Sequence, residues 1–214
     1  MTNDKAPGLN RVPPNAFEAF NDDKLIPLLD FFNKYWLEGN DFDEGHESQI
    51  VPVPKIEDVS DTNKWRGVTL MDIGVKIFRS ILCGRVFKII KANGGEYHFS
   101  STPGVRCQDG SFTLKTLLHL WHNHNLPSWG AFTDLVKAVD ISNHKLLIAI
   151  LARYGDPTHF YSAIVRMYKN SVVRLIIEKI DTSIPFNVGV KQGDRMAPVL
   201  LLFLIMAFAK TLEN

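Results

Sequence analysis

Hydrophobic residues along this chain recur mainly at the spacing of an α-helix. This spacing, together with capping residues and glycine stops, predicts helices at 15–37 (one or two), 69–92, 111–124, 143–154, 157–168 and 196–209. In the 69–92 helix the expected apolar stripe is formed by Ile73, Ile77, Ile81 with Leu82, and Ile89. We expect Arg79 and Arg85 to lie off this stripe. The 196–209 segment is apolar all round, too short to span a membrane, and is expected to be a buried helix.

Strand patterns are fewer and shorter. The β-rich residues 172–180 predict a hairpin that turns at 181–183 into 184–188, with Pro185 favouring an edge position. The run 131–135 predicts a short buried strand. The expected fold class is α+β, with a helix-rich N-terminal part followed by a partial antiparallel sheet.

Two prolines limit one further extended segment. Pro52 and Pro54 bracket a piece that we expect not to be a central strand, because proline donates no hydrogen bond to a strand ladder.

Composition allows one or two domains and excludes a disulfide scaffold. Of 214 residues, 45% are hydrophobic, which is enough for a substantial core. Cys83 and Cys107 are each expected to be small core residues in a reducing compartment. The N-terminus lacks an apolar signal segment, so we expect an intracellular protein with no membrane partner, nuclear or cytoplasmic, of undetermined oligomeric state.

Charge is divided unevenly along the chain. Residues 1–62 hold five Lys or Arg and thirteen Asp or Glu, a net of −8, whereas 63–214 hold nineteen and ten, a net of +9. A basic body suits a phosphate-backbone binder. The excess is mild, and charge alone does not separate nucleic acid from neutral partners.

Two segments carry residues suited to phosphate and metal chemistry. Ala-Phe-Thr-Asp-Leu-Val-Lys-Ala-Val-Asp, at 131–140, places the carboxylate of Asp134 at the end of an apolar run, where it could bind Mg²⁺. Gly-Val-Lys-Gln-Gly-Asp-Arg-Met-Ala-Pro-Val-Leu, at 189–200, joins a glycine-flanked polar loop to an apolar helix. Each alone also fits an ordinary turn. We expect Asp140 to cap the following helix or to bind backbone amides.

In this order, about fifty residues apart, the two segments resemble the reverse transcriptase domain of non-LTR retrotransposons. Three upstream segments extend the resemblance over nearly the whole chain: Lys5-Ala6-Pro7-Gly8, Val51-Pro52-Val53-Pro54-Lys55, and Trp65-Arg66-Gly67-Val68-Thr69-Leu70 with Lys76-Ile77-Phe78. The resemblance implies a fingers-like region over 1–128, and the first half of a right-handed polymerase palm over 129–214.

The resemblance also implies an activity and its site. Such domains are RNA-directed DNA polymerases that use an RNA template, a DNA primer, deoxynucleoside triphosphates and two Mg²⁺ ions. By this likeness Asp134 is the first metal ligand, supplemented by the carbonyl of Leu135. Lys55 and Arg66 match positions that hold the incoming triphosphate, where Arg can donate two hydrogen bonds at once. Solvated surface cations are the alternative for both.

Three further positions complete the implied nucleotide site. Gln192 and Gly193 match a loop that lies against the nascent base pair. Val139 stands where the family usually has an aromatic residue that excludes a 2′-hydroxyl by its bulk. Because valine is much smaller, weak discrimination against ribonucleotides is expected. Arg195 also departs from the pattern, since a small residue or proline is usual there.

The family's remaining metal ligands form an adjacent Asp-Asp pair, and none follows Asp134 in this sequence. One carboxylate cannot hold two Mg²⁺ ions, so we expect the chain as given to be inactive. Three interpretations stay open: a polymerase fragment that needs the rest of its palm, a non-catalytic nucleic-acid-binding remnant that uses the 69–92 helix, and a relic without function whose helix at 196–212 lacks strands to pack against.

Overall fold

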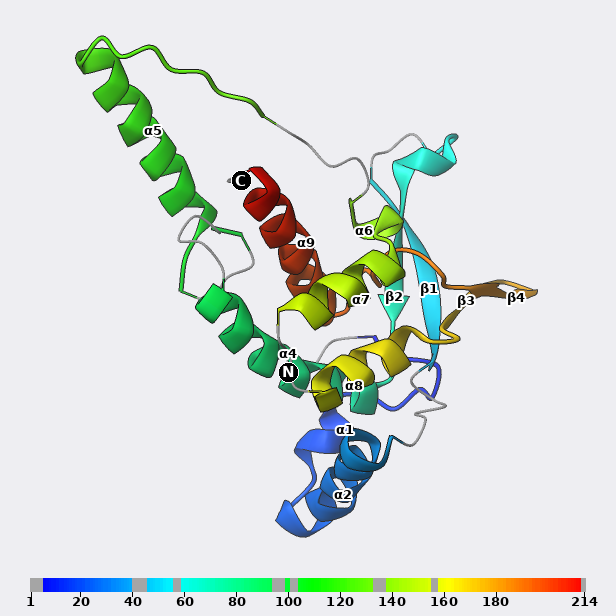
Figure 1. Ribbon diagram of the computed structural model, residues 1–214. Helices are drawn as coiled ribbons and strands as arrows, with labels where there is room; N and C mark the ends of the chain where they lie inside the picture. Colours follow the sequence, from blue (N-terminus) through cyan, green and yellow to red (C-terminus); the bar gives the residue numbers. More distant parts are fainter. Residues whose placement is uncertain are drawn as a thin grey trace.

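The computed structural model describes residues 6–39, 46–55, 59–93, 99–100, 104–132, 138–154 and 158–212. They form an α+β fold, as expected, in which helices pack beside a four-stranded sheet (Figure 1). Its elements are α1 (Asn15–Glu18), α2 (Asp22–Glu38), β1 (Glu47–Pro54), η1 (Thr62–Lys64), β2 (Trp65–Leu70), α4 (Ile73–Asn93), α5 (Cys107–Asn123), α6 (Ala138–Ile141), α7 (His144–Arg153), α8 (Thr158–Tyr168), β3 (Val172–Ile177), β4 (Ile180–Pro185) and α9 (Met196–Leu212).

The sheet has the strand order β2-β1-β3-β4 and is mixed, because β1 runs parallel to β3 while the other pairs are antiparallel. The expectation that the segment with Pro52 and Pro54 could not be a central strand is therefore wrong. Within β1, only the first half, Glu47–Ile50, pairs with β3. Both prolines lie in the second half, which among the described strands has β2 alone as a neighbour, so their missing N–H groups interrupt no second ladder.

The C-terminal hairpin is present, but its turn lies earlier than expected. β3 and β4 meet at Ile177 and Ile180, so the turn is Glu178-Lys179, with Glu178 at a positive φ of 50°. Asp181 belongs to β4, where its carboxylate accepts hydrogen bonds from Arg174 on the facing strand. β4 is an edge strand, as the proline at its end predicted.

The helix predicted at 143–154 begins where expected, as α7. The side chain of Asn143 caps α7 by accepting from the backbone N–H groups of Lys145 and Leu146, at 2.9 and 3.2 Å. α9 is present as expected, but it is buried on one face only, since Ile205 and Phe208 are 41% and 50% exposed. No described helix is long and apolar enough to cross a membrane.

Two expectations near α5 are wrong. Cys107 is exposed because it opens α5, a helix that projects from the body of the molecule and has no buried residue (Figure 1). The first two residues of the predicted strand at 131–135 are not in a strand. Ala131 and Phe132 pair with none of the described strands, and Phe132 is 90% exposed. The rest of that segment, with Asp134 and Leu135, lies outside the described residues.

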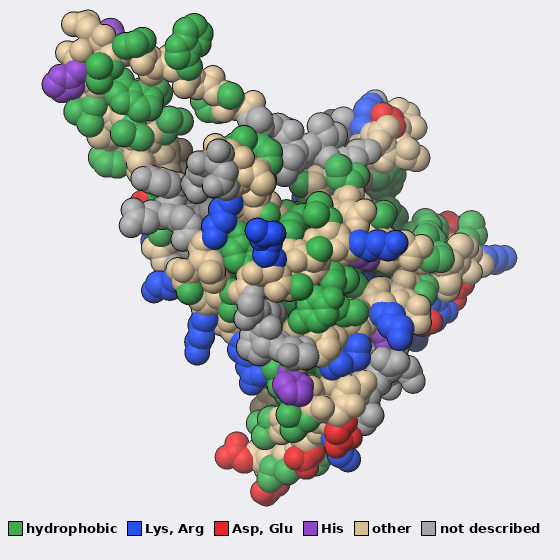
Figure 2. Space-filling view, viewed as in Figure 1, with side chains coloured by type: hydrophobic (Ala, Val, Ile, Leu, Met, Phe, Trp, Pro, Cys, Tyr) green, Lys and Arg blue, Asp and Glu red, His purple; other side chains and the backbone are tan. Residues whose placement is uncertain are grey.

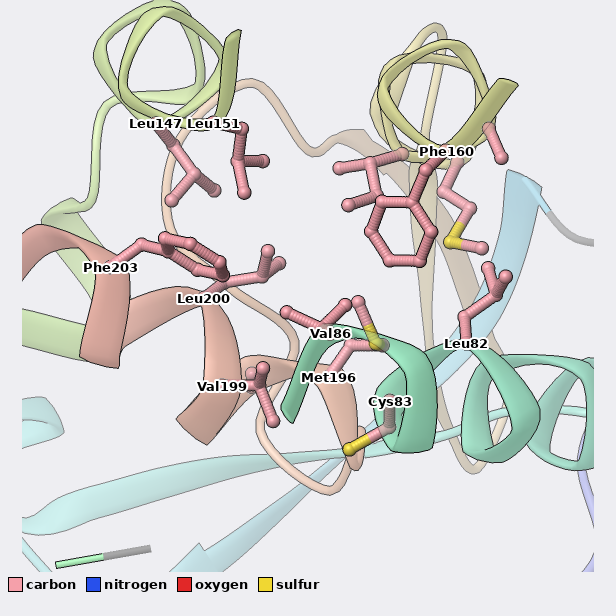
Figure 3. Packing of buried hydrophobic residues seen from close by; sticks show 14 of the residues in the cluster. Leu82, Cys83, Val86, Leu147, Leu151, Phe160, Met196, Val199, Leu200 and Phe203 are labelled. Carbon is pink, nitrogen blue, oxygen red and sulfur yellow. The ribbon is translucent and has the colours of Figure 1, made fainter. Parts of the chain in front are cut away.

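The hydrophobic core lies where α4, α7, α8 and α9 meet (Figure 3). Leu82 and Val86 of α4 lie below Phe160 of α8, and Leu147 and Leu151 of α7 point toward Leu200 and Phe203 of α9. Because α4 and α9 fall on opposite sides of the predicted division at residue 128, one core joins the two predicted regions. That division stays a prediction.

The buried stripe of α4 is rotated from the predicted one. It runs through Val75, Arg79, Leu82, Val86 and Ile90. Arg79 therefore lies inside the core at 1% exposure, whereas the expected stripe residue Ile81 is 44% exposed. The prediction that Arg79 lies on the polar face is wrong, because a buried carboxylate in another segment compensates its charge.

Surface charge follows the division seen in the sequence. Acidic side chains gather over α1 and α2 at one end of the molecule, while Lys and Arg side chains are spread over the middle of the face in Figure 2. The apolar side chains of α5 are exposed at the opposite end.

Candidate functional site

One cavity brings together the predicted site residues that the structure describes. It has a volume of about 820 Å³ and is lined by Lys55, Arg66, Val68, Ser100, Ala138, Val139, Asp140, Gln192, Gly193, Asp194, Ala197, Pro198, Leu201, Leu202 and Ile205. These residues come from five separate segments of the chain. The remaining candidates, Asp134 and Leu135, lie outside the described residues.

The walls of the cavity differ in chemistry. Arg66 and Val68 face it from β2, because residues two apart in a strand share a face. Lys55 follows β1, and its amine donates to the carbonyl of Asn63 at 3.2 Å. α9 supplies an apolar wall that includes Leu201 and Ile205. Cations on one side and apolar side chains on the other suit a ligand with both phosphate and flat apolar parts.

The loop 189–195 is held against β2 at its centre. The carbonyl of Gln192 accepts from the backbone N–H of Thr69 at 2.6 Å. Gly193 has a φ of +103°, and a Cβ built on it would lie 2.9 Å from the carbonyl oxygen of Thr69. Glycine is therefore required at this position both by backbone conformation and by space.

The start of the same loop is held against α6 and α7. The backbone N–H of Val190 donates to the carbonyl of Val139 at 2.7 Å, and that of Gly189 donates to Ser142 at 2.8 Å. Nε2 of His144 donates to the carbonyl of Gly189 at 2.6 Å, since a carbonyl can only accept. Val139 and the loop are thus fixed relative to each other.

Among the described residues, Asp140 neither caps a helix nor accepts from a backbone amide, contrary to expectation. It lies within the short helix α6, and its Oδ1 accepts a hydrogen bond from Nε2 of Gln192 at 2.8 Å. Gln192 is 52 residues away in sequence, but its side chain lies within hydrogen-bonding distance of Asp140 because the loop is held against α6.

A buried ion pair lies beneath the loop. Nη1 of Arg79 donates to Oδ2 of Asp194, and both side chains are 1% exposed. Oδ1 of Asp194 also accepts from the backbone N–H of Met196 at 2.9 Å, which caps the N-terminus of α9. Burial alone lowers the pKa of Arg79, but Asp194 outweighs it and the pKa rises above its ordinary value, so this guanidinium stays charged.

A second buried cation accompanies this pair. Lys191 is 0% exposed, and its Nζ has no hydrogen-bond partner among the described residues, although it lies 5.8 Å from the centre of the Phe186 ring. Burial, and then repulsion by Arg79, lower the pKa of Lys191 to about 7, against a smaller opposing effect of Asp194. Burial also raises the pKa of Tyr168, whose ring lies beneath the guanidinium of Arg79, well above its usual range.

Sequence reasoning missed this buried cluster of Arg79, Lys191 and Asp194. One signal for Arg79 was available, since it falls four residues after Val75 and three before Leu82, inside the true stripe. No comparable signal marks Lys191, because a lysine in a glycine-flanked polar loop ordinarily lies in water.

The carboxylates seen at the cavity are not placed to form a metal centre. Asp140 holds Gln192, and Asp194 is paired with Arg79. Among the described residues, no three His, Cys, Asp or Glu side chains are grouped so that they could hold a metal ion. Mg²⁺ binding at Asp134 and Leu135 stays a prediction.

Gly193→Ala is expected to lower the free energy of unfolding by about 1–3 kcal/mol, because alanine is strained at this φ and its Cβ crowds Thr69. Gly84→Ala is the matched control. Gly84 lies in α4 with no atom within 4 Å of a built Cβ, so alanine there should stabilise by about 0.5–1 kcal/mol. Urea denaturation measures both. Equal effects of the two substitutions would contradict this account of the loop.

Lys191→Met is expected to remove a pH dependence of stability. The pKa of Lys191 is about 7 in the native state and 10.5 when unperturbed, so between these values the unfolded chain binds a proton that the native chain has released. Stability contributed by this group should therefore rise with pH across that window. Denaturant midpoints measured through it should show a shallower rise in Lys191→Met than in wild type. Lys145→Met, at an exposed position, is the control, and the same slope in all three proteins would refute the assignment.

Comparison with known proteins relates the chain to retrotransposon proteins. It is 25% identical over 169 residues to the Retrovirus-related Pol polyprotein from type-2 retrotransposable element R2DM of Drosophila melanogaster, which covers 78% of this chain and 16% of that protein. It is 24% identical over 221 aligned positions to the Retrovirus-related Pol polyprotein from type-1 retrotransposable element R2 of Bradysia coprophila, which covers 100% of this chain and 24% of that protein.

No protein-family model matches the chain. The chain spans about a sixth and about a quarter of the length of these two relatives. At this level of identity, the chain is a distant relative of the Pol polyproteins of R2 retrotransposable elements.

Proposed function

We propose that this chain forms the nucleotide- and primer–template-binding part of an RNA-directed DNA polymerase from a retroelement. The observation that carries the proposal is the cavity lined by Lys55, Arg66, Val139, Gln192 and Gly193. These residues were selected from the sequence by four separate motifs, which place them over almost 140 residues of the chain. Their meeting in one cavity supports a shared ligand. The distant relationship to retrotransposon Pol polyproteins supports the same reading.

The chemistry of the cavity suits a nucleoside triphosphate. Lys55 and Arg66 would bind the phosphates, with Arg66 able to donate two hydrogen bonds at once. The apolar wall of α9 and the side chain of Val139 offer surface to the sugar and base. Gly193, without a side chain, lets the ligand approach the backbone closely.

The proposal includes Mg²⁺ at Asp134 and the carbonyl of Leu135. A bound Mg²⁺ would neutralise phosphate charge and polarise the reacting phosphoryl group. The described residues would orient the nucleotide and hold its phosphates.

A non-catalytic nucleic-acid-binding role is the second candidate, and the structure changes its details. Arg79 is buried in the core, so α4 would contact phosphates through the Lys and Arg residues on its exposed face. The relic interpretation assumed that the helix at 196–212 lacks packing partners, whereas α9 buries Val199, Leu200 and Phe203 and contacts α4 and α7.

Binding of a nucleoside triphosphate with Mg²⁺, and of an RNA–DNA primer–template, tests the proposal. Arg66→Ala is expected to weaken triphosphate binding about tenfold, since a charge-assisted contact contributes about 1.5–3 kcal/mol. It should also reduce the salt dependence of primer–template binding by about one phosphate. Arg153→Ala, an exposed arginine at the end of α7 outside the cavity, serves as the control for triphosphate binding. Triphosphate affinity that is absent in wild type, or identical in wild type and Arg66→Ala, would overturn the proposal.

Val139→Phe is expected to make the cavity select deoxyribonucleotides. Wild type should bind UTP and dUTP, which differ only at the 2′ position, with similar affinity, because valine leaves room for a 2′-hydroxyl. Phenylalanine should weaken UTP binding about tenfold and leave dUTP binding nearly unchanged, since a steric conflict costs about 1–3 kcal/mol. Ile205→Phe adds bulk to the α9 wall of the same cavity and should not discriminate between the two. If wild type already rejects UTP as strongly as Val139→Phe does, Val139 is not the determinant.

A further inference from the structure

The hydrogen bond between Asp140 and Gln192 crosses between two segments that both line the cavity. Nε2 of Gln192 lies 2.8 Å from Oδ1 of Asp140. The two backbones that carry these side chains are fixed to each other by the bond between Val190 and Val139, and the loop is fixed to β2 through the carbonyl of Gln192. The hydrogen bond between Asp140 and Gln192 therefore joins two segments whose backbones are already fixed relative to each other.

The chemistry of this bond sets the orientation of the Gln192 amide. A carboxylate can only accept hydrogen bonds, whereas an amide has a donating and an accepting end. The NH₂ group of Gln192 must therefore face Asp140, and its carbonyl oxygen Oε1 is held at the opposite end of the amide. Without a partner that can only accept, the amide group could rotate by about 180° and exchange its oxygen and nitrogen at little cost.

We propose that Asp140 is a positioning residue that fixes the amide of Gln192 so that Oε1 is presented to a ligand in the cavity. The ligand group that meets Oε1 must then be a hydrogen-bond donor, such as a hydroxyl or amino group. The ligand itself rests on the proposed nucleotide-binding function, but the orientation of the amide does not.

Side-chain NMR of Gln192 tests the orientation without any ligand. In wild type, one Nε2 proton should be shifted downfield and protected from exchange, because it is donated to the Asp140 carboxylate. Asp140→Ala should lose both features at neutral pH. Asp181→Ala removes an exposed carboxylate of β4, which is paired with Arg174, and should leave the Gln192 signal unchanged. Identical Gln192 signals in wild type and Asp140→Ala would overturn the proposal.

Nucleotide affinity tests the consequence for binding. Asp140→Ala and Asp140→Asn remove the same charge, but asparagine keeps an accepting oxygen. We expect Asp140→Ala to weaken the binding of dATP with Mg²⁺ about fivefold, and Asp140→Asn to restore part of that loss. Asp140→Ala combined with Gln192→Ala should bind no more weakly than Gln192→Ala alone, because Asp140 acts through Gln192.

The outcomes separate the two proposals. Effects of Asp140→Ala and Gln192→Ala that simply add would show that Asp140 does not act through the amide, and would overturn its positioning role. Wild type that fails to bind dATP would defeat the proposed function, while the NMR comparison would still decide the orientation. A loss of thermal stability in Asp140→Ala that Asp140→Asn does not share, with unchanged Gln192 signals, would assign Asp140 a purely structural role.

Discussion

The buried ion pair between Arg79 and Asp194 is the interaction on which the rest of this structure depends. It joins the middle of α4 to the N-terminus of α9, and Asp194 also caps α9. Removing one partner of such a pair leaves an uncompensated buried charge, which costs about 3–5 kcal/mol. That is a large part of the stability of an ordinary domain. Gln192 and Gly193 lie between two buried residues, Lys191 and Asp194, so the core itself sets the position of the loop in the cavity.

Local patterns predicted the parts of the fold that depend on near neighbours in sequence. The helix at 143–154 was located by its helical spacing, although its cap is Asn143 and not Asp140, and α9 was located by its apolar run. The resemblance to reverse transcriptases also predicted five site residues that line one cavity: Lys55, Arg66, Val139, Gln192 and Gly193. Their predicted roles as nucleotide ligands still require binding experiments.

The errors arose where a distant partner decides the outcome. Arg79 could be read as a surface cation because nothing near it in sequence reveals Asp194, 115 residues away. The proline-containing strand β1 became central because β3 pairs with only its first half, a register that no local pattern encodes. The hairpin turn moved because Asp181, a common turn residue, lies opposite Ile176 in the strand pair and accepts from Arg174 instead.

The parallel pairing of β1 with β3 has a consequence for how the chain folds. Ser48 on β1 donates to the carbonyl of Val172 on β3, a separation of 124 residues. During synthesis, the antiparallel pair of β1 and β2 can form early, but one edge of β1 must wait until β3, more than a hundred residues later, has been made. Contacts of such long range slow folding, because loop closure must precede them. The nascent chain therefore carries an unpaired strand edge and an open apolar core until α9 is synthesised, and in this interval it is most exposed to misassembly.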